Sequence, residues 1–214
     1  MSRFLLSRDA SGYALIDQIN PRRVLRIDFG SARWRQRLAG SGRELLTRAV
    51  AAKPGQRVLD CTAGLGADSF LLAWKGCEVT LIERSNTLYL MLEDALQRAR
   101  QVQALDPIVA RLDLRRGDAR QLMMSLASPP DVILIDPMFP ARRKTAEVKG
   151  DLQLLQQFVG KQEDVLTLLD GALQTGCKRI VVKRPLRGGE LPGYVPTGSV
   201  VGKASRFDLF TSRR

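Results

Sequence analysis

The sequence predicts an α/β protein built on a mostly parallel sheet that is covered by helices on both faces. Strand and helix patterns alternate from residue 56 onward, as in proteins with parallel sheets. The run at residues 132–136 is continuously apolar, which is typical of a central parallel strand. With 214 residues, 44% of them hydrophobic, the chain is long enough for one such domain and a small appendage.

The elements of this sheet can be placed along the chain. Parallel strands are expected at residues 57–60, 78–83, 112–116, 132–136 and 179–183, with a closing antiparallel pair at 194–200 and 206–210. Helices are expected at 86–103, 152–158 and 163–173, and an apolar face at helical spacing begins at Asp68. The final strand is therefore expected to run antiparallel to the rest.

The first part of the chain, residues 1–53, is expected to form a small N-terminal extension of a main domain at 54–214. It offers two short strands at 13–17 and 24–29 and a helix at 44–52. Between them, residues 30–43 are basic and contain glycines, so we expect a mobile segment that attracts anions.

Composition narrows the function. The chain has 34 Lys and Arg residues against 22 Asp and Glu, and a net charge of +12 favours a polyanionic partner. There is no histidine, and the three cysteines are far apart, which argues against a metal site and against Ser-His or Cys-His catalysis. The odd cysteine count suits a reducing cytosol, and no stretch is long enough to span a bilayer. We therefore expect a cytoplasmic protein with no membrane partner.

Acidic residues end three consecutive predicted strands. Asp60 ends the first, Glu83 ends the second, and Asp118 lies just beyond the third. Ligands of open α/β sheets bind at the carboxyl ends of the strands, where a carboxylate after the second strand can accept hydrogen bonds from ribose hydroxyls. Each carboxylate taken alone is equally consistent with a loop cap.

A glycine turn lies among these acids. Gly64 and Gly66 permit a sharp bend or a close backbone approach, and the helix that follows directs free N–H groups at a nucleotide-sized ligand. Plain strand-to-helix connections also use such turns.

The loop after the central strand carries the sharper signal. It reads Asp136-Pro137-Met138-Phe139-Pro140. Asp136 and the carbonyl of Pro137 can accept hydrogen bonds from an exocyclic amine, and Phe139 offers a flat face for a base to stack on. Asp136, Pro137 and Phe139 are the predicted catalytic set. The alternative is a rigid turn with a packed phenylalanine.

Five motifs together resemble one known family. They are Asp60-x-Thr62-Ala63-Gly64-x-Gly66-x-Asp68, Glu83-Arg84, Asp136-Pro137-Met138-Phe139-Pro140, Val181-Val182-Lys183-Arg184-Pro185 and Arg206-Phe207-Asp208. In this order they resemble the ribosomal small subunit methyltransferase J family, over residues 27–210. The resemblance implies a Rossmann-like class I methyltransferase fold with S-adenosyl-L-methionine as the cofactor. It also implies a reaction, methylation of N2 of a guanine in 16S ribosomal RNA, so that ribosomal RNA or the small ribosomal subunit would be the partner.

The resemblance also implies where the cofactor binds. Ala67 and Asp68 would line its pocket, Glu83 and Arg84 would meet the ribose, Asp118 and Ala119 the adenine, and Asp136 the methionyl end. With the strand end and the glycine turn, the expected cofactor set is Asp60, Gly64, Gly66, Ala67, Asp68, Glu83, Arg84, Asp118, Ala119 and Asp136.

Basic residues near these motifs are candidates for phosphate contacts. The expected RNA-binding set is Arg33, Arg35, Arg43, Arg142, Arg143, Lys183, Arg184 and Arg206. Two other functions remain open at this stage. One is a dinucleotide oxidoreductase of the NAD type, because Gly64-x-Gly66-x-x-Ser69 partly matches that fingerprint. The other is a non-catalytic RNA-binding module with a methyltransferase-like fold.

Overall fold

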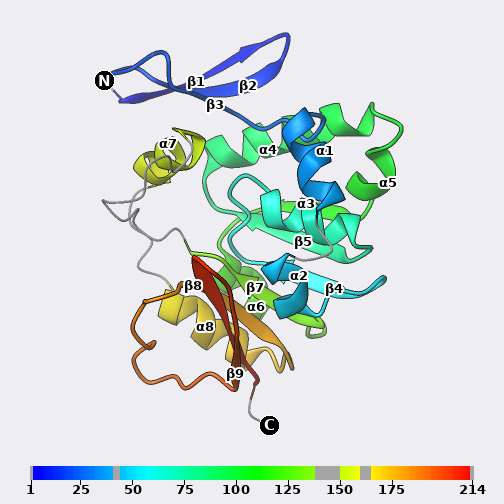
Figure 1. The fold of residues 1–214 in the computed structure, drawn as a ribbon, viewed down its shortest axis with the longest axis vertical. Coiled ribbons are helices and arrows are strands. Elements are labelled where there is room, and N and C mark those ends of the chain that lie inside the picture. The colour runs from blue at the N-terminus through cyan, green and yellow to red at the C-terminus, as the bar shows by residue number, and fades with distance from the viewer. Residues whose placement is uncertain (1, 41–43, 138–149, 160–164, 213–214) are drawn as a thin grey trace.

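A seven-stranded sheet forms the centre of the molecule (Figure 1). The computed structural model describes residues 2–40, 44–137, 150–159 and 165–212. The strand order is β6-β5-β4-β7-β8-β10-β9. The strands are β4 (Arg57–Asp60), β5 (Glu78–Glu83), β6 (Leu112–Arg116), β7 (Val132–Ile135), β8 (Ile180–Pro185), β9 (Gly198–Val201) and β10 (Ser205–Phe210).

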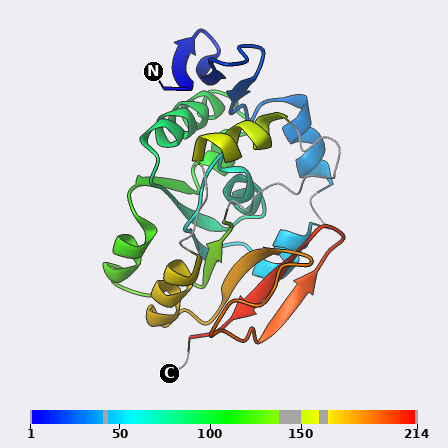
Figure 2. The same cartoon turned by 90° about the vertical axis from the view of Figure 1, so that its left-hand side faces the viewer.

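The direction of the strands confirms the predicted fold class. The first five strands in this order pair in parallel, whereas β10 is antiparallel to both β8 and β9. Helices lie on both faces of the sheet (Figure 2). They are α1 (Ala32–Ala39), α2 (Leu45–Val50), α3 (Ala67–Trp74), α4 (Asn86–Arg100), α5 (Asp106–Val109), α6 (Ala119–Met124), α7 (Gly150–Val159) and α8 (Val165–Gln174).

The two faces of the sheet have separate cores because side chains alternate along each strand. On β7, Val132 and Leu134 join the core beneath α3 and α4, while Ile133 and Ile135 join the core beneath α6 and α8. All four of these side chains are fully buried. This double burial explains why the central strand has a continuous apolar run.

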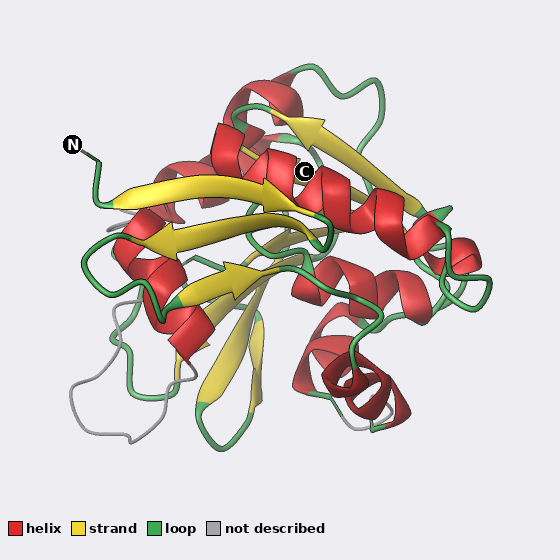
Figure 3. Ribbon diagram, turned by 90° about the horizontal axis from the view of Figure 1, so that it is seen from above, coloured by secondary structure: helices red, strands yellow, loops and turns green. Residues whose placement is uncertain are grey.

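A second, three-stranded antiparallel sheet is formed by β1 (Phe4–Asp9), β2 (Gly12–Asp17) and β3 (Val24–Arg26). It lies across α4 and α7, as the view from above shows (Figure 3). Leu15 and Leu25 from this sheet share one buried cluster with Phe70 and Leu92 of the main domain. Strand β1 was not predicted, because its arginine and aspartate obscure the alternation of apolar residues.

The segment at residues 30–43 was predicted to be mobile, and this is wrong for residues 32–39, which form helix α1. Trp34 and Leu38 give the helix an apolar face at i,i+4 spacing. The Trp34 ring lies 5.3 Å from the Phe29 ring and 5.2 Å from the Phe70 ring, measured between centroids. The helix is therefore fixed to the core while Arg33 and Arg35 stay exposed.

None of the helices in the described ranges is long and apolar enough to cross a membrane.

Candidate functional site

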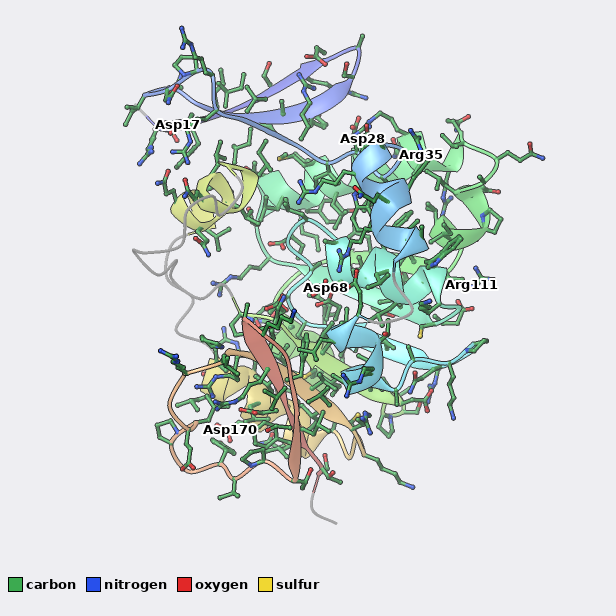
Figure 4. All side chains as sticks on the ribbon, viewed as in Figure 1. Asp17, Asp28, Arg35, Asp68, Arg111 and Asp170 are labelled. Carbon is green, nitrogen blue, oxygen red and sulfur yellow. The ribbon has the colours of Figure 1, made fainter. Side chains whose placement is uncertain are left out.

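A cavity of about 420 Å³ opens at the carboxyl ends of the parallel strands. Its wall brings together the turn after β4, the end of β5, the start of α6 and the end of β7. Asp68 marks its position in the middle of the molecule, below α1 (Figure 4). The predicted cofactor residues that line it are Asp60, Gly64, Ala67, Asp68, Glu83, Arg84, Asp118, Ala119 and Asp136.

The two glycines of the turn differ in what surrounds them. Gly64 lines the cavity, and a Cβ atom there would meet no described atom closer than the Thr62 carbonyl at 3.8 Å. Gly66 is outside the described lining of the cavity, and a Cβ atom there would lie 2.6 Å from Cδ1 of Leu92. Both have positive φ, 54° and 69°. Gly64 thus leaves the cavity open, whereas Gly66 lets the turn pack closely on α4.

Asp60 holds the glycine turn after β4 in place through hydrogen bonds. Its carboxylate accepts hydrogen bonds from the Thr62 N–H at 3.0 Å and from the Ser69 hydroxyl at 2.6 Å. Burial raises the pKa of Asp60 to about 6 against these stabilising bonds. Asp60 therefore fixes the start of α3 relative to β4.

Glu83 is buried at the end of β5 and keeps acceptor capacity towards the cavity. One oxygen accepts from the Gly64 N–H at 2.9 Å, and the other accepts from the Ser85 N–H at 2.7 Å. Burial raises the pKa of Glu83 above its usual range. A carboxylate has about four acceptor sites, so roughly two remain for vicinal hydroxyls.

Asp118 is the N-cap of α6 and is held by Arg120. Its carboxylate accepts from the Arg120 N–H at 2.9 Å and from the Arg120 guanidinium at 2.5 Å. This guanidinium lowers the pKa of Asp118. The adjoining Ala119 is buried and also lines the cavity.

Asp136 lies opposite the glycine turn, directly after β7. Its N–H donates to the Thr62 hydroxyl at 2.7 Å, which ties the two loops together. Its carboxylate accepts from Lys183 Nζ at 2.5 Å. Burial raises the pKa of Asp136 to about 7, and Lys183 opposes this shift. Pro137 is buried beside it and lines the cavity.

Comparison with known proteins identifies this arrangement. A family described as putative SAM-dependent methyltransferase matches residues 2–212. The ribosomal RNA small subunit methyltransferase J of Stutzerimonas stutzeri is 42% identical over 195 residues, which cover 89% of this chain and 76% of that protein. The namesake from Pseudomonas aeruginosa is 41% identical, over 88% of this chain and 74% of its own length.

The chain belongs to the ribosomal RNA small subunit methyltransferase J family. Its fold also matches a solved structure, that of the SAM-dependent methyltransferase NGO1261 of Neisseria gonorrhoeae. The TM-score is 0.76 at 31% identity, over 97% of this chain and 82% of the other. The recognition made from the motifs is thereby confirmed, and the methyltransferase is favoured over the NAD-type oxidoreductase.

The cavity of this methyltransferase fits its cofactor, S-adenosylmethionine. The acceptor sites left on Glu83 suit ribose hydroxyls, and the open space at Gly64 admits a ligand against the backbone. At the other end, the carboxylates of Asp68 and Asp136, with Lys183 between them, offer acceptors for the amino group of the cofactor. An apolar wall completes the cavity, and it includes Leu155, Phe158 and Val159 of α7 and Val165 and Leu168 of α8.

The apolar wall was missed from the sequence. The sequence predicted helices at 152–158 and 163–173, but helical spacing alone does not reveal which side chains line a cavity.

The predicted RNA-binding residues have different environments. Arg33 and Arg35 are exposed on α1. Lys183 lies in the cavity wall, paired with Asp136. Arg184 is buried and donates to the Gly189 carbonyl at 2.7 Å. Arg206 binds the Asp208 carboxylate at 2.9 Å and two carbonyls of the 186–188 loop. Arg35 also donates to the Gly30 carbonyl at 2.7 Å, so it is exposure that separates Arg33 and Arg35 from Lys183, Arg184 and Arg206. Arg43, Phe139, Arg142 and Arg143 lie outside the described residues.

Proposed function

We propose that this methyltransferase transfers the methyl group of S-adenosylmethionine to the exocyclic N2 amine of a guanine in 16S ribosomal RNA, in the cytoplasm. The names of the relatives support the class of RNA. The observation that carries the proposal is the position of Asp136 and Pro137. They line the same cavity as Glu83 and Gly64, which supports a loop that would accept the amine beside the cofactor.

The cofactor would lie along the carboxyl ends of β4, β5 and β6. Glu83 would accept hydrogen bonds from the ribose hydroxyls, and Asp118 and Ala119 would contact the adenine. Asp68 and Asp136 would face the cationic methionyl end. When bound, S-adenosylmethionine supplies an electrophilic methyl group, so a covalent enzyme intermediate is unnecessary.

The protein's task is to position a weak nucleophile. The lone pair of a guanine N2 amine is delocalised into the ring. Hydrogen bonds from its N–H groups to the Asp136 carboxylate and the Pro137 carbonyl would favour a pyramidal nitrogen and aim the lone pair. Positioning of this kind is worth up to about 7–11 kcal/mol in ideal cases. The proton can leave after the transfer, so Asp136 need not be a strong base.

The RNA would approach from the side of α1. Arg33 and Arg35 are exposed there, and the sequence adds Arg43, Arg142 and Arg143 as candidates for phosphate contacts. A paired or stacked guanine would have to leave its stack to reach the cavity. Stacking on Phe139, predicted from the sequence, would hold the base at about 1–3 kcal/mol.

A labelling experiment tests this function. The purified protein is incubated with S-adenosylmethionine carrying a labelled methyl group and with small ribosomal subunits or 16S ribosomal RNA that lack the modification. The RNA is then digested to nucleosides and separated against standards. We expect the label in N2-methylguanosine. Label in another nucleoside would refute the target, and unchanged labelling by Asp136→Ala would refute the role of the loop.

A further inference from the structure

Lys183 lies between two carboxylates in the cavity wall. Its ammonium nitrogen is 2.5 Å from Oδ2 of Asp136 and 3.5 Å from Oδ2 of Asp68. The position follows from strand register. β7 and β8 are parallel with Ile135 paired to Val182, so Asp136, directly after β7, and Lys183, within β8, lie at the same level of the sheet.

The lysine side chain lies beside a buried aromatic ring. Lys183 pairs in register with Phe207 of β10, a buried residue, and its ammonium lies 5.9 Å from the centroid of the Phe207 ring. The side chain is 31% exposed, and that of Asp136 is 26% exposed. Both groups therefore face the cavity and are not sealed beneath it.

The charges around Asp136 make Lys183 important for the ionisation of its carboxyl group. Among the described residues, two carboxylates raise the pKa of Asp136 by repulsion, Asp60 from β4 and Asp68 from α3. Lys183 from β8 is the cation that lowers it. The nearby cation Arg37 of α1 binds groups other than Asp136. It binds Asp68 at 3.0 Å, Glu44 at 3.0 Å and the Ala67 carbonyl at 3.0 Å.

Loss of the lysine would leave Asp136 facing two like charges in a partly desolvated site, which favours protonation. A protonated carboxyl group has a hydroxyl donor at one oxygen, so it accepts an amine N–H less well than a carboxylate does.

We propose that Lys183 is a positioning residue for methyl transfer, which favours the ionised form of the Asp136 carboxylate, aims it into the cavity and does not contact RNA phosphate. The inference rests on the proposed role of Asp136 as the acceptor for the amine. It replaces the RNA-binding role that the sequence suggested for Lys183.

The first test uses nuclear magnetic resonance and no RNA substrate. The ¹³C signals of the Asp side-chain carboxyl groups are titrated in the cofactor-free protein, with Asp136→Asn to assign Asp136. In Lys183→Met the pKa of Asp136 should rise by at least about one unit, since one nearby positive charge is lost. In Lys183→Arg it should stay near the wild-type value. Lys178→Met, at an exposed site just before β8, is the matched control and should leave it unchanged.

The wild-type protein gives a second reading that does not depend on how a variant folds. The ¹⁵N signal of the Lys183 ammonium should shift with the same midpoint as the Asp136 carboxyl group. Two results would overturn the proposal. One is a Lys183 ¹⁵N signal that does not shift as Asp136 titrates, and the other is an Asp136 pKa in Lys183→Met that equals the wild-type value.

The second test measures single-turnover methylation against pH at saturating cofactor and RNA. Below the pKa of Asp136, Lys183→Met should lose about tenfold in rate for each unit by which that pKa rises, and the rate should recover at high pH. The salt dependence of RNA binding should match the wild type. A loss that is equal at every pH, with a shallower salt dependence, would show a phosphate contact instead. If the wild-type protein methylates no guanine, the proposed function fails, while the resonance titration still decides the Lys183–Asp136 pair.

Discussion

At the scale of single residues, the glycine turn shows how one motif contains two different requirements. Gly64 and Gly66 have similar positive φ angles, but only Gly66 has another side chain, that of Leu92, where its Cβ atom would lie. Gly64 instead forms part of the cavity wall. A sequence pattern reports that glycine is needed at both positions and does not distinguish packing from ligand access.

We therefore expect opposite profiles from two alanine variants. Gly66→Ala should lower the free energy of unfolding by about 1–3 kcal/mol more than Gly64→Ala, because it adds a clash to the same φ strain. Gly64→Ala should raise the Kd for S-adenosylmethionine about tenfold or more, because it adds a methyl group at the cavity wall. Urea denaturation and calorimetry measure the two quantities. Equal effects of both variants on stability and on cofactor binding would contradict this division.

The raised pKa of Asp60 predicts how the stability of the protein depends on pH. Its pKa in the folded protein is about 6, above the usual value of 3.8, so the folded state binds more protons than the unfolded state between these values. The stability that Asp60 contributes is thus full below the unfolded pKa and is lost as the pH rises through about 6.

The variant Asp60→Asn removes this titration. From pH 5 to pH 7, the wild-type protein should lose about 1 kcal/mol of unfolding free energy relative to Asp60→Asn. Urea denaturation at the two pH values measures the difference. A pH-independent difference would show that Asp60 does not titrate in this range.

At the scale of elements, the N-terminal sheet supports one wall of the cavity. The Phe4 ring of β1 packs edge-on against Phe158 of α7, with centroids 5.5 Å apart. Arg23 donates to Gln153 at 2.9 Å, and Arg3 donates to Gln157 at 2.9 Å. Since α7 also lines the cavity, the sheet is linked to one wall of the cavity through this helix.

Hydrogen exchange can test this link. Phe4→Ala should raise the exchange rates of the α7 amides by about tenfold, which corresponds to about 1.4 kcal/mol, while the amides of β4 and β7 keep their protection. Leu5→Ala, the neighbouring residue at 46% exposure, is the matched control and should change α7 little. Similar rates in both variants would mean that the sheet does not support α7.

Elements of the main domain could be predicted because their signals are local. The strands at 57–60, 78–83 and 112–116 have the bounds expected from the sequence, since the first two are short, mostly apolar runs between charged residues and the third alternates leucines with charged residues. Three short elements could not be predicted in this way, the helices α5 and α6 and the strand β1. Tertiary packing stabilises them more than their own sequence does.

The cavity shows the same limit. Strand-end acids such as Glu83 and Asp136 could be placed at one edge of the sheet, because parallel strands end together. The pairing of Lys183 with Asp136 depends on the register of β7 with β8, which no local pattern contains. Lys183 therefore read as one basic residue among many in a chain of net charge +12.

At the scale of the whole molecule, the positive charge predicts how RNA binding responds to salt. Each phosphate contact lowers the slope of log K against log salt by about 0.9 on duplex and about 0.7 on single-stranded nucleic acid. Arg33 and Arg35 are exposed on α1, whereas the Arg206 side chain is only 19% exposed.

Arg33→Gln and Arg35→Gln should each weaken RNA binding and make this slope shallower by about one contact. Binding to 16S ribosomal RNA is measured over a range of potassium chloride concentrations. Arg111→Gln, which removes the same charge at the start of β6, is the control. A wild-type affinity that is insensitive to salt would contradict an electrostatic approach from α1.

The measurement that tests the central claim most directly is the single-turnover rate of Asp136→Ala at saturating S-adenosylmethionine and RNA. We expect a loss of at least about 100-fold, as for other positioned polar groups in active sites, with a cofactor Kd within about tenfold of the wild type. Asp113→Ala, an exposed carboxylate on β6, should keep the wild-type rate. A folded Asp136→Ala protein that methylates RNA at the wild-type rate would contradict the claim that this carboxylate aims the acceptor amine.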